Sequence, residues 1–137
     1  MRSHHEISDT ALEQQFEELS LDPELFTHEA HLRLAWIHLK KYGIDAAISN
    51  ICEQIKKFDA THGDGTKFHK TVTVAAVRSV FHFYQKSKSD TFEGFIGEFP
   101  KLKTNFKGLL DAHYGFDLFS SEEAKKDYID PDLLPFS

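Results

Sequence analysis

The chain has 137 residues, the length of one ordinary domain. Its formal net charge is −6 with histidine neutral, and this negative balance argues against nucleic acid as a partner. No apolar run reaches the roughly 20 residues of a membrane span, and the opening MRSHHEISD lacks the apolar stretch of a signal peptide, so we expect no membrane association. The single cysteine, Cys52, excludes an intrachain disulfide and is typical of a cytoplasmic protein.

Apolar residues recur at helical spacing along most of the chain. This spacing predicts a first helix over about residues 9–19, and Pro23 separates it from the next one. Thr27 is a natural N-cap and Gly43 a natural C-terminal stop, so the second helix should run from Thr27 to Tyr42.

The two longest predicted helices follow. The third, over about residues 44–61, has the cleanest apolar face, and Cys52 flanks this face, so we expect a buried thiol. The loop THGDGT precedes a fourth helix over about residues 67–86, for which Asp64 or Thr66 would be the N-cap. Its TVTV stretch is rich in β-branched residues, which leaves a short strand as an alternative, but the apolar period continues beyond it and favours a helix.

Shorter helices are predicted in the last third of the chain. Asp90 and Glu93 are spaced as a capping box, which predicts a short helix that ends before the next proline. A further helix is expected over about residues 105–113. Ser120 with Glu123 forms a second capping box and opens the last short helix.

These segments predict an all-α fold, a compact single-domain helical bundle over residues 1–137, with about four main helices and two or three short C-terminal ones. We expect residues 1–8 to be mobile and assign no role to His4 and His5. Residues 130–137 should form an extended tail whose apolar side chains pack on the body, namely Leu133, Leu134 and Phe136.

Histidine is abundant, with nine residues, and three of them lie near the start of a predicted helix and face its apolar side. His28 and His31 are three apart in the second helix, and His69 lies in the first turn of the fourth. The partial positive charge of a helix N-terminus resists protonation of an imidazole there, which keeps a lone pair available. We expect His62 and His82 to face solvent instead.

A neutral imidazole can ligate a metal ion or act as a general base. Two imidazoles at positions i and i+3 reach a common point above one helix face, and a third from a neighbouring helix would complete a three-histidine set with an open coordination position. The pattern therefore favours a divalent metal, either zinc, iron or nickel. The competing interpretation is that each imidazole satisfies a helix end, because an H-x-x-H spacing alone is a weak signal.

Three blocks of the sequence carry a resemblance to known proteins: FTHEAHLRLAWIHLKKYG, FHKTVTVA and YGFDLFSSEEAKKDYIDPDLL. They resemble a family of small bacterial all-helical proteins without an established function, whose first two blocks read F-x-H-x-x-H-L-R-x-A-W and Y-H-E-T-x-T. The resemblance runs from about Phe26 to Leu134. Carried over by position, the family's motif residues are His28, His31, His69, Thr71 and Thr73.

Two positions depart from the pattern of that family. Phe68 stands where tyrosine is usual, and Lys70 stands where glutamate is usual. An acidic partner is therefore absent from the second block of this chain. The resemblance supplies no reaction.

Two functional hypotheses follow from the sequence. In the first, the second and fourth helices bring their N-termini together, and the three motif histidines line a pocket for a divalent metal or a small molecule. Thr71, Thr73 and Tyr114 would line or orient this site, and whether metal-assisted catalysis occurs there stays open. In the second hypothesis, the chain is a non-catalytic helical interaction module or homodimer in which the histidines are structural.

Overall fold

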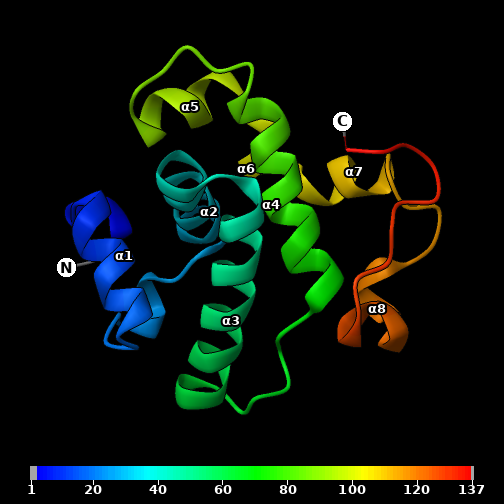
Figure 1. The fold of residues 1–137 in the computed structure, drawn as a ribbon, viewed down its shortest axis with the longest axis horizontal. Coiled ribbons are helices and arrows are strands. Elements are labelled where there is room, and N and C mark those ends of the chain that lie inside the picture. The colour runs from blue at the N-terminus through cyan, green and yellow to red at the C-terminus, as the bar shows by residue number, and fades with distance from the viewer. Residues whose placement is uncertain (1–2, 137) are drawn as a thin grey trace. The chain divides into compact units, whose positions relative to one another are not determined.

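The structure is a computed structural model that describes residues 3–136, in which helices are the only regular elements (Figure 1). The predicted all-α class is confirmed, and the TVTV stretch is helical. The chain divides into two compact units, residues 1–68 and 69–137.

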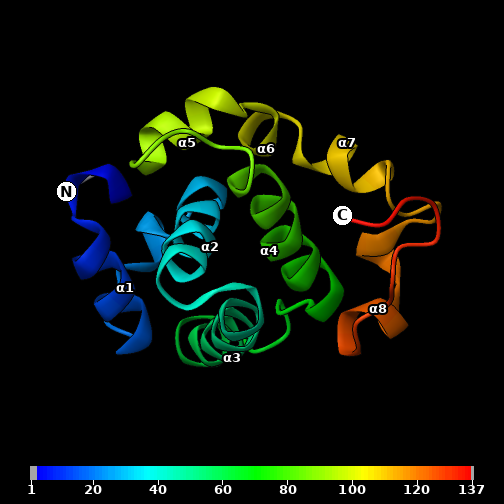
Figure 2. The same ribbon diagram turned by 45° about the horizontal axis from the view of Figure 1, so that its top comes forward.

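Helices α2 and α3 form the body of the first unit. α2 packs against α3, and α1 lies against both of them (Figure 2). The elements of this unit, in chain order, are η1 (His4–Glu6), α1 (Asp9–Glu17), η2 (Pro23–Leu25), α2 (His28–Tyr42) and α3 (Ile44–His62), where η marks a 3₁₀ helix.

The predicted ends of α2 are confirmed. The Thr27 hydroxyl accepts a hydrogen bond from the backbone N–H of Ala30 at 3.2 Å, as an N-cap does. At the other end Gly43 has a φ of 86°, in the left-handed region that strains residues with a Cβ atom. A glycine at this point therefore ends α2 and lets α3 begin at the next residue.

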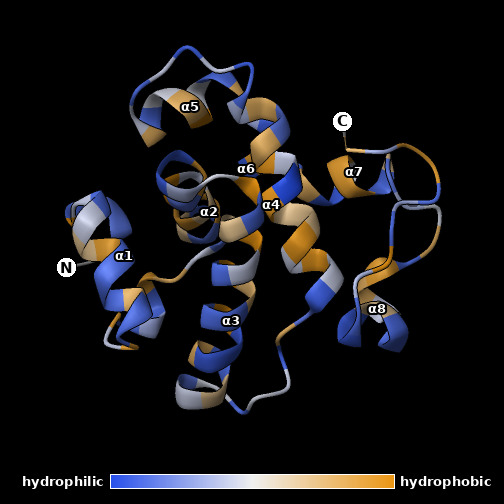
Figure 3. Ribbon diagram, in the orientation of Figure 1, coloured by the Kyte–Doolittle hydropathy of each residue, from blue (hydrophilic) through white to orange (hydrophobic). Residues whose placement is uncertain are grey.

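The apolar face predicted for α3 is also present. Blue and orange positions alternate along this helix in Figure 3, as expected when one face is apolar and the other polar. Ile51 and Ile55 are buried on the apolar side, and Cys52 is only 6% exposed. The expectation of a buried thiol is therefore confirmed.

A leucine in the left-handed conformation follows α1. Leu19 has a φ of 63°, and its N–H donates to the Phe16 carbonyl at 3.1 Å. The Ser20 N–H reaches back to the Gln15 carbonyl at 2.8 Å, which completes a Schellman motif. His62 is exposed as expected, and its Nε2 donates to the Leu19 carbonyl at 2.7 Å.

The second unit consists of one long helix and several short ones (Figure 1). α4 contacts α8 and the 3₁₀ turn η3. The elements, in chain order, are α4 (Lys70–Tyr84), α5 (Phe92–Glu98), α6 (Lys101–Thr104), α7 (Phe106–Asp111), η3 (Leu118–Ser120) and α8 (Glu122–Lys126).

α4 starts later than the sequence predicted, and neither of the expected caps is used. The Asp64 side chain closes a local turn on Thr66 instead. The carboxylate of Asp59 then accepts the N–H groups of Lys67 and Phe68, which keeps these residues out of the helix. The N-cap of α4 is consequently His69.

Two other predicted caps are wrong by one residue. Thr91 rather than Asp90 caps α5, because its side chain accepts the N–H of Gly94. Ser121 rather than Ser120 caps α8, because the Ser121 side chain accepts the N–H of Ala124. The helices themselves were predicted correctly in both places.

The C-terminal tail packs on the second unit through one of its three apolar side chains. Phe136 is 9% exposed and belongs to the core of this unit. Leu133 and Leu134 are each 56% exposed, so the expectation that they pack on the body is wrong. The core members are Ala75, Leu110, Tyr114, Leu118, Ala124 and Phe136.

Candidate functional site

The first two predicted site residues begin α2. His28 is the first residue of the helix and is exposed. His31 is half-buried, its ring lies 5.4 Å from that of Phe26, and its Nε2 has no hydrogen-bond partner in residues 3–136. Burial lowers the pKa of His31 from 6.5 to about 4, with a smaller contribution from His28, so the ring is neutral at pH 7.

Both ring nitrogens of His69 are engaged within the second unit. Nδ1 accepts the N–H of Val72 at 3.1 Å, and Nε2 lies 3.0 Å from the Leu118 carbonyl. Because Nδ1 is an acceptor, the ring proton is on Nε2, and the one lone pair that could bind a metal, on Nδ1, already accepts the Val72 N–H. The Thr73 hydroxyl donates to the His69 carbonyl, which gives the start of α4 one more hydrogen bond. This geometry favours the structural interpretation of His69.

The predicted three-histidine site stays a prediction. His28 and His31 belong to the first unit, whereas His69 begins the second. Among residues 3–136, neither His28 and His31 nor His69 belongs to a group of three side chains that could hold a metal ion within one unit.

Thr71 and Tyr114 hold a segment of the chain. The Thr71 hydroxyl donates to the Asp127 carbonyl at 2.8 Å and accepts the Ile129 N–H at 3.0 Å. The Tyr114 hydroxyl donates to the Ile129 carbonyl at 2.7 Å, and burial raises the pKa of this phenol. The two hydroxyls therefore fix the residues after α8, and their predicted role in a ligand site stays a prediction.

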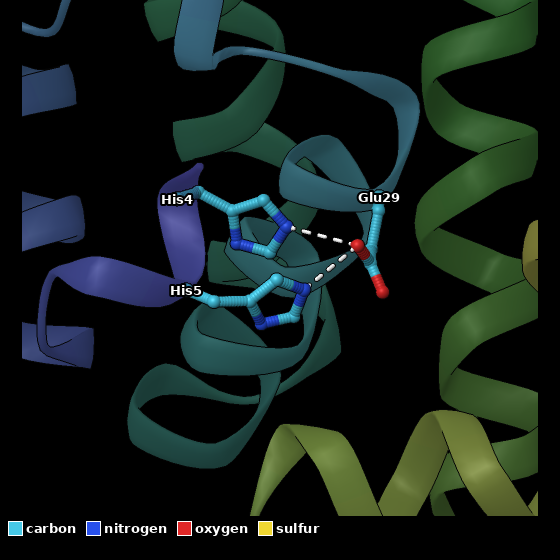
Figure 4. A group of neighbouring side chains, drawn as sticks. All are labelled: His4, His5 and Glu29. Carbon is cyan, nitrogen blue, oxygen red and sulfur yellow. Dashed lines mark hydrogen bonds and ion pairs between the residues drawn. The ribbon is translucent and has the colours of Figure 1, made fainter. Parts of the chain in front are cut away.

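A different cluster of ligating side chains lies in the first unit. His4 and His5 come from η1, and Glu29 comes from the first turn of α2 (Figure 4). Nε2 of His5 lies 2.9 Å and Nε2 of His4 lies 3.2 Å from the same oxygen, Oε1 of Glu29. Figure 4 shows the two rings side by side, with both Nε2 atoms directed toward this oxygen.

Arg33 holds the backbone of this cluster in place. Its side chain is only 4% exposed and donates to the carbonyls of His4, at 2.6 Å, and Ile7, at 2.9 Å. It also forms an ion pair with Asp9 at 2.8 Å. The guanidinium thereby ties η1 and the start of α1 to α2, which fixes His4 over the start of that helix.

The protonation state of His4 follows from its burial and from its contacts with Arg33 and Glu29. Burial lowers its pKa most, and the charges of His5 and Arg33 lower it further, whereas the hydrogen bond to Glu29 opposes this effect. An N–H of Arg33 faces Nδ1 at 3.2 Å, so Nδ1 accepts and Nε2 carries the proton that is donated to Glu29. His4 is therefore a neutral bridge between a buried cation and a carboxylate.

The sequence pattern does not predict this cluster, because His4 and His5 lie ahead of the first predicted helix. One available signal was the tetrapeptide SHHE, whose serine and glutamate form a capping box in the structure. That spacing marks an ordered helical turn at residues 3–6, although it does not name Glu29 as the partner.

The cluster has the composition of a metal site. His, Cys, Asp and Glu are the side chains that usually ligate metals. In the described part of the chain, one group of three such residues, His4, His5 and Glu29, has ligating atoms that all lie within 4.8 Å of one another. Two imidazoles and a carboxylate are ligands that zinc, iron and nickel accept. The exposed fractions of His5 and Glu29, 40% and 14%, leave an approach from solvent.

Comparison of the chain with family models, curated proteins and solved structures found no match. No helix within residues 3–136 combines the length and apolar character that a membrane crossing requires.

Proposed function

We propose that the chain binds a divalent transition-metal ion through His4, His5 and Glu29. The observation that carries this proposal is the approach of two imidazole nitrogens to a single carboxylate oxygen, at 2.9 and 3.2 Å. An ion near this oxygen would meet three ligands that Arg33 and the helix α2 already hold in place, so little ordering is needed on binding. The partly exposed side of His5 leaves further coordination positions to water.

The three ligands are not equivalent. A metal on Nε2 of His4 displaces the proton found there, and the ring must then carry its proton on Nδ1, which faces an Arg33 N–H. This shift of the ring proton makes His4 the weakest of the three ligands. His5 and Glu29 therefore contribute most of the affinity, and binding weakens at acid pH because metal and protons compete for the same atoms.

Calorimetric titration with Zn²⁺, Ni²⁺ and Co²⁺ at pH 7.5 tests the proposal, on protein without an affinity tag of histidines. His5→Ala and Glu29→Gln should each weaken binding of the tightest metal at least tenfold. The matched control is His62→Ala, which removes an exposed histidine of the same unit outside the cluster. The proposal fails if the two cluster variants bind every metal as the parent does, or if the control loses as much affinity as they do.

A second candidate is the non-catalytic helical module, in which the same side chains only hold the fold together. The bridge from Arg33 through His4 to Glu29 favours it, because this bridge attaches η1 to α2 without any ion. In that case His5→Ala and Glu29→Gln lower the melting temperature in a chelator, and addition of metal does not raise it in the parent. Under the metal proposal, saturating Zn²⁺ raises the melting temperature of the parent more than that of either variant.

A further inference from the structure

We infer that the loop after α7 and the C-terminal tail form a docking surface for a basic amphipathic helix of a partner protein. The two segments belong to the second unit and run side by side in both views of the ribbon (Figure 1, Figure 2). Exposed apolar side chains gather here, and such a concentration marks interaction surfaces. Of the five large apolar side chains exposed in the described part of the chain, four lie in these segments or between them, namely Phe116, Phe119, Leu133 and Leu134.

Two of these side chains are neighbours, although they are distant in the sequence. The Leu133 N–H donates to the His113 carbonyl at 2.9 Å, and the Gly115 N–H donates to the carboxylate of Asp132 at 2.8 Å. A Cβ atom at Gly115 would lie 3.3 Å from a methyl carbon of Leu133, so this side chain lies against the backbone beside Phe116. Phe116 and Leu133, which are 38% and 56% exposed, form the apolar patch.

The tail that carries Leu133 is anchored on both sides of the exposed leucines. Nδ1 of His113 donates to the Leu134 carbonyl at 2.8 Å, and its ring stacks on that of Phe136 at 4.2 Å between centroids. His82, which we expected to face solvent, is half-buried beside the backbone of Phe136. The apolar patch therefore belongs to an ordered segment, and a partner that covers it needs to order little of this chain.

A depression of about 420 Å³ lies beside Phe116 and gives the partner a place for one long side chain. Of its two carboxylates, that of Asp111 has a cationic partner, Lys107, at 3.5 Å. The carboxylate of Asp117 instead accepts the Ser120 hydroxyl, and this hydrogen bond lowers its pKa, so the group is charged at pH 7. The residues that line the depression are Lys107, Asp111, Tyr114, Gly115, Phe116 and Asp117.

Negative charge on both sides of the apolar patch determines the chemistry of the partner. Asp117 follows Phe116 and Asp132 precedes Leu133, and neither carboxylate forms an ion pair within residues 3–136. A complementary surface presents apolar groups with lysine or arginine beside them, as an amphipathic helix does with residues three and four apart. A basic side chain in the depression can stack on Phe116 and pair with Asp117 at once. Anionic lipid and nucleic acid have the same sign as these carboxylates and are repelled.

The probe is a synthetic peptide of about 18 residues with leucine on one helical face and lysine on the other, long enough to form a helix. Its match carries glutamate in place of lysine. Each is titrated into the full chain by calorimetry at pH 7.5 with EDTA, so that the result is independent of the metal site. The lysine peptide should bind in a saturable manner and at least tenfold more weakly when NaCl is raised from about 50 to about 500 mM. Equal binding of the two peptides, or no saturable binding of the lysine peptide, would overturn the inference.

Two variants test the surface itself. Leu133→Ser should bind the lysine peptide about tenfold more weakly and melt as the parent does, because the side chain is mostly exposed. Asp132→Asn keeps an acceptor for the Gly115 N–H but removes the charge, so it should weaken binding about threefold. The matched control is Glu17→Gln, which removes one exposed carboxylate from α1 in the other unit. Parent-like affinity of Leu133→Ser, or a loss in the control equal to that of Asp132→Asn, would show that the peptide binds elsewhere.

Discussion

The hydroxyl of Thr71 accepts a hydrogen bond from the backbone N–H of Ile129 at 3.0 Å, although 58 residues separate the two along the chain. The same hydroxyl donates to the Asp127 carbonyl. One side chain at the start of α4 thus satisfies both a donor and an acceptor of the segment after α8. This contact joins the FHKTVTVA stretch to the segment that follows α8.

Thr71→Val should therefore lower the free energy of unfolding by about 1–3 kcal/mol, because it leaves two backbone groups without their partner at a fully buried position. Thr73→Val is the matched control on the same helix. The His69 carbonyl that Thr73 contacts also accepts the Thr73 N–H, so its loss should change stability much less. Urea unfolding of both variants measures the difference, and equal destabilisation would contradict the role given to Thr71.

The half-buried His31, whose Nε2 is enclosed without a hydrogen-bond partner in residues 3–136, should make the fold sensitive to acid. Its folded pKa of about 4 lies below its usual 6.5, so between these values the unfolded chain takes up a proton that the folded chain does not. The free energy of unfolding should fall by up to about 1.4 kcal/mol per pH unit as the pH drops from 6.5 toward 4. Above 6.5 both states are neutral and His31 makes no such contribution.

His31→Leu should abolish this component and be at least as stable as the parent at pH 7, because it replaces an unpartnered buried nitrogen by apolar atoms. The measured quantity is the difference in pH slope between variant and parent, since burial also lowers the pKa of His4, His38 and His82. His28→Gln should keep most of the slope, because the charge of His28 is the smaller cause. A His31→Leu slope identical to that of the parent would show that His31 titrates alike in both states.

The left-handed Leu19 should store backbone strain that glycine relieves. Leu19→Ala and Leu19→Gly remove the same side-chain contacts, but only the alanine variant keeps the Cβ atom that is strained at a φ of 63°. The glycine variant should therefore be more stable than the alanine variant by roughly 1 kcal/mol. Thermal unfolding of the pair measures this, and an alanine variant as stable as the glycine variant would mean that residue 19 is not held left-handed in solution.

Both ends of α2 could be predicted from the sequence because the groups that form them are local. The Thr27 hydroxyl and the Gly43 backbone act within their own turn, and both predictions are confirmed. The start of α4 could not be predicted in this way, because the Asp59 carboxylate of the preceding helix binds the N–H of Lys67 and of Phe68. Residue spacing alone does not reveal such a competing acceptor.

The candidate site could be predicted only in part for the same reason, because residue spacing does not reveal contacts between distant segments. His31 was selected because it lies on the apolar face of α2, and that periodicity is readable. The partnership of His4 with Glu29 crosses 25 residues and depends on Arg33, which binds backbone carbonyls of the N-terminal segment. A tertiary contact of this kind leaves no periodic pattern, so the sequence marks an ordered turn without identifying its partner.

The interpretation of His69 leads to the prediction that separates a helix cap from a metal ligand. His69→Ala removes the acceptor of the Val72 N–H and the donor to the Leu118 carbonyl, so it should lower the free energy of unfolding by about 1–3 kcal/mol. His69→Asn should recover part of this loss, because asparagine is a good N-cap but its shorter side chain gives up the contact with Leu118. Neither variant should change the affinity for Zn²⁺, Ni²⁺ or Co²⁺, since both ring nitrogens of His69 are already used. The predicted three-histidine site requires the opposite result, in which both variants lose metal affinity while their melting temperatures without metal match that of the parent. Calorimetric titration and thermal unfolding of the same samples decide between the two, and His62→Ala reports the effect of losing a histidine that caps no helix.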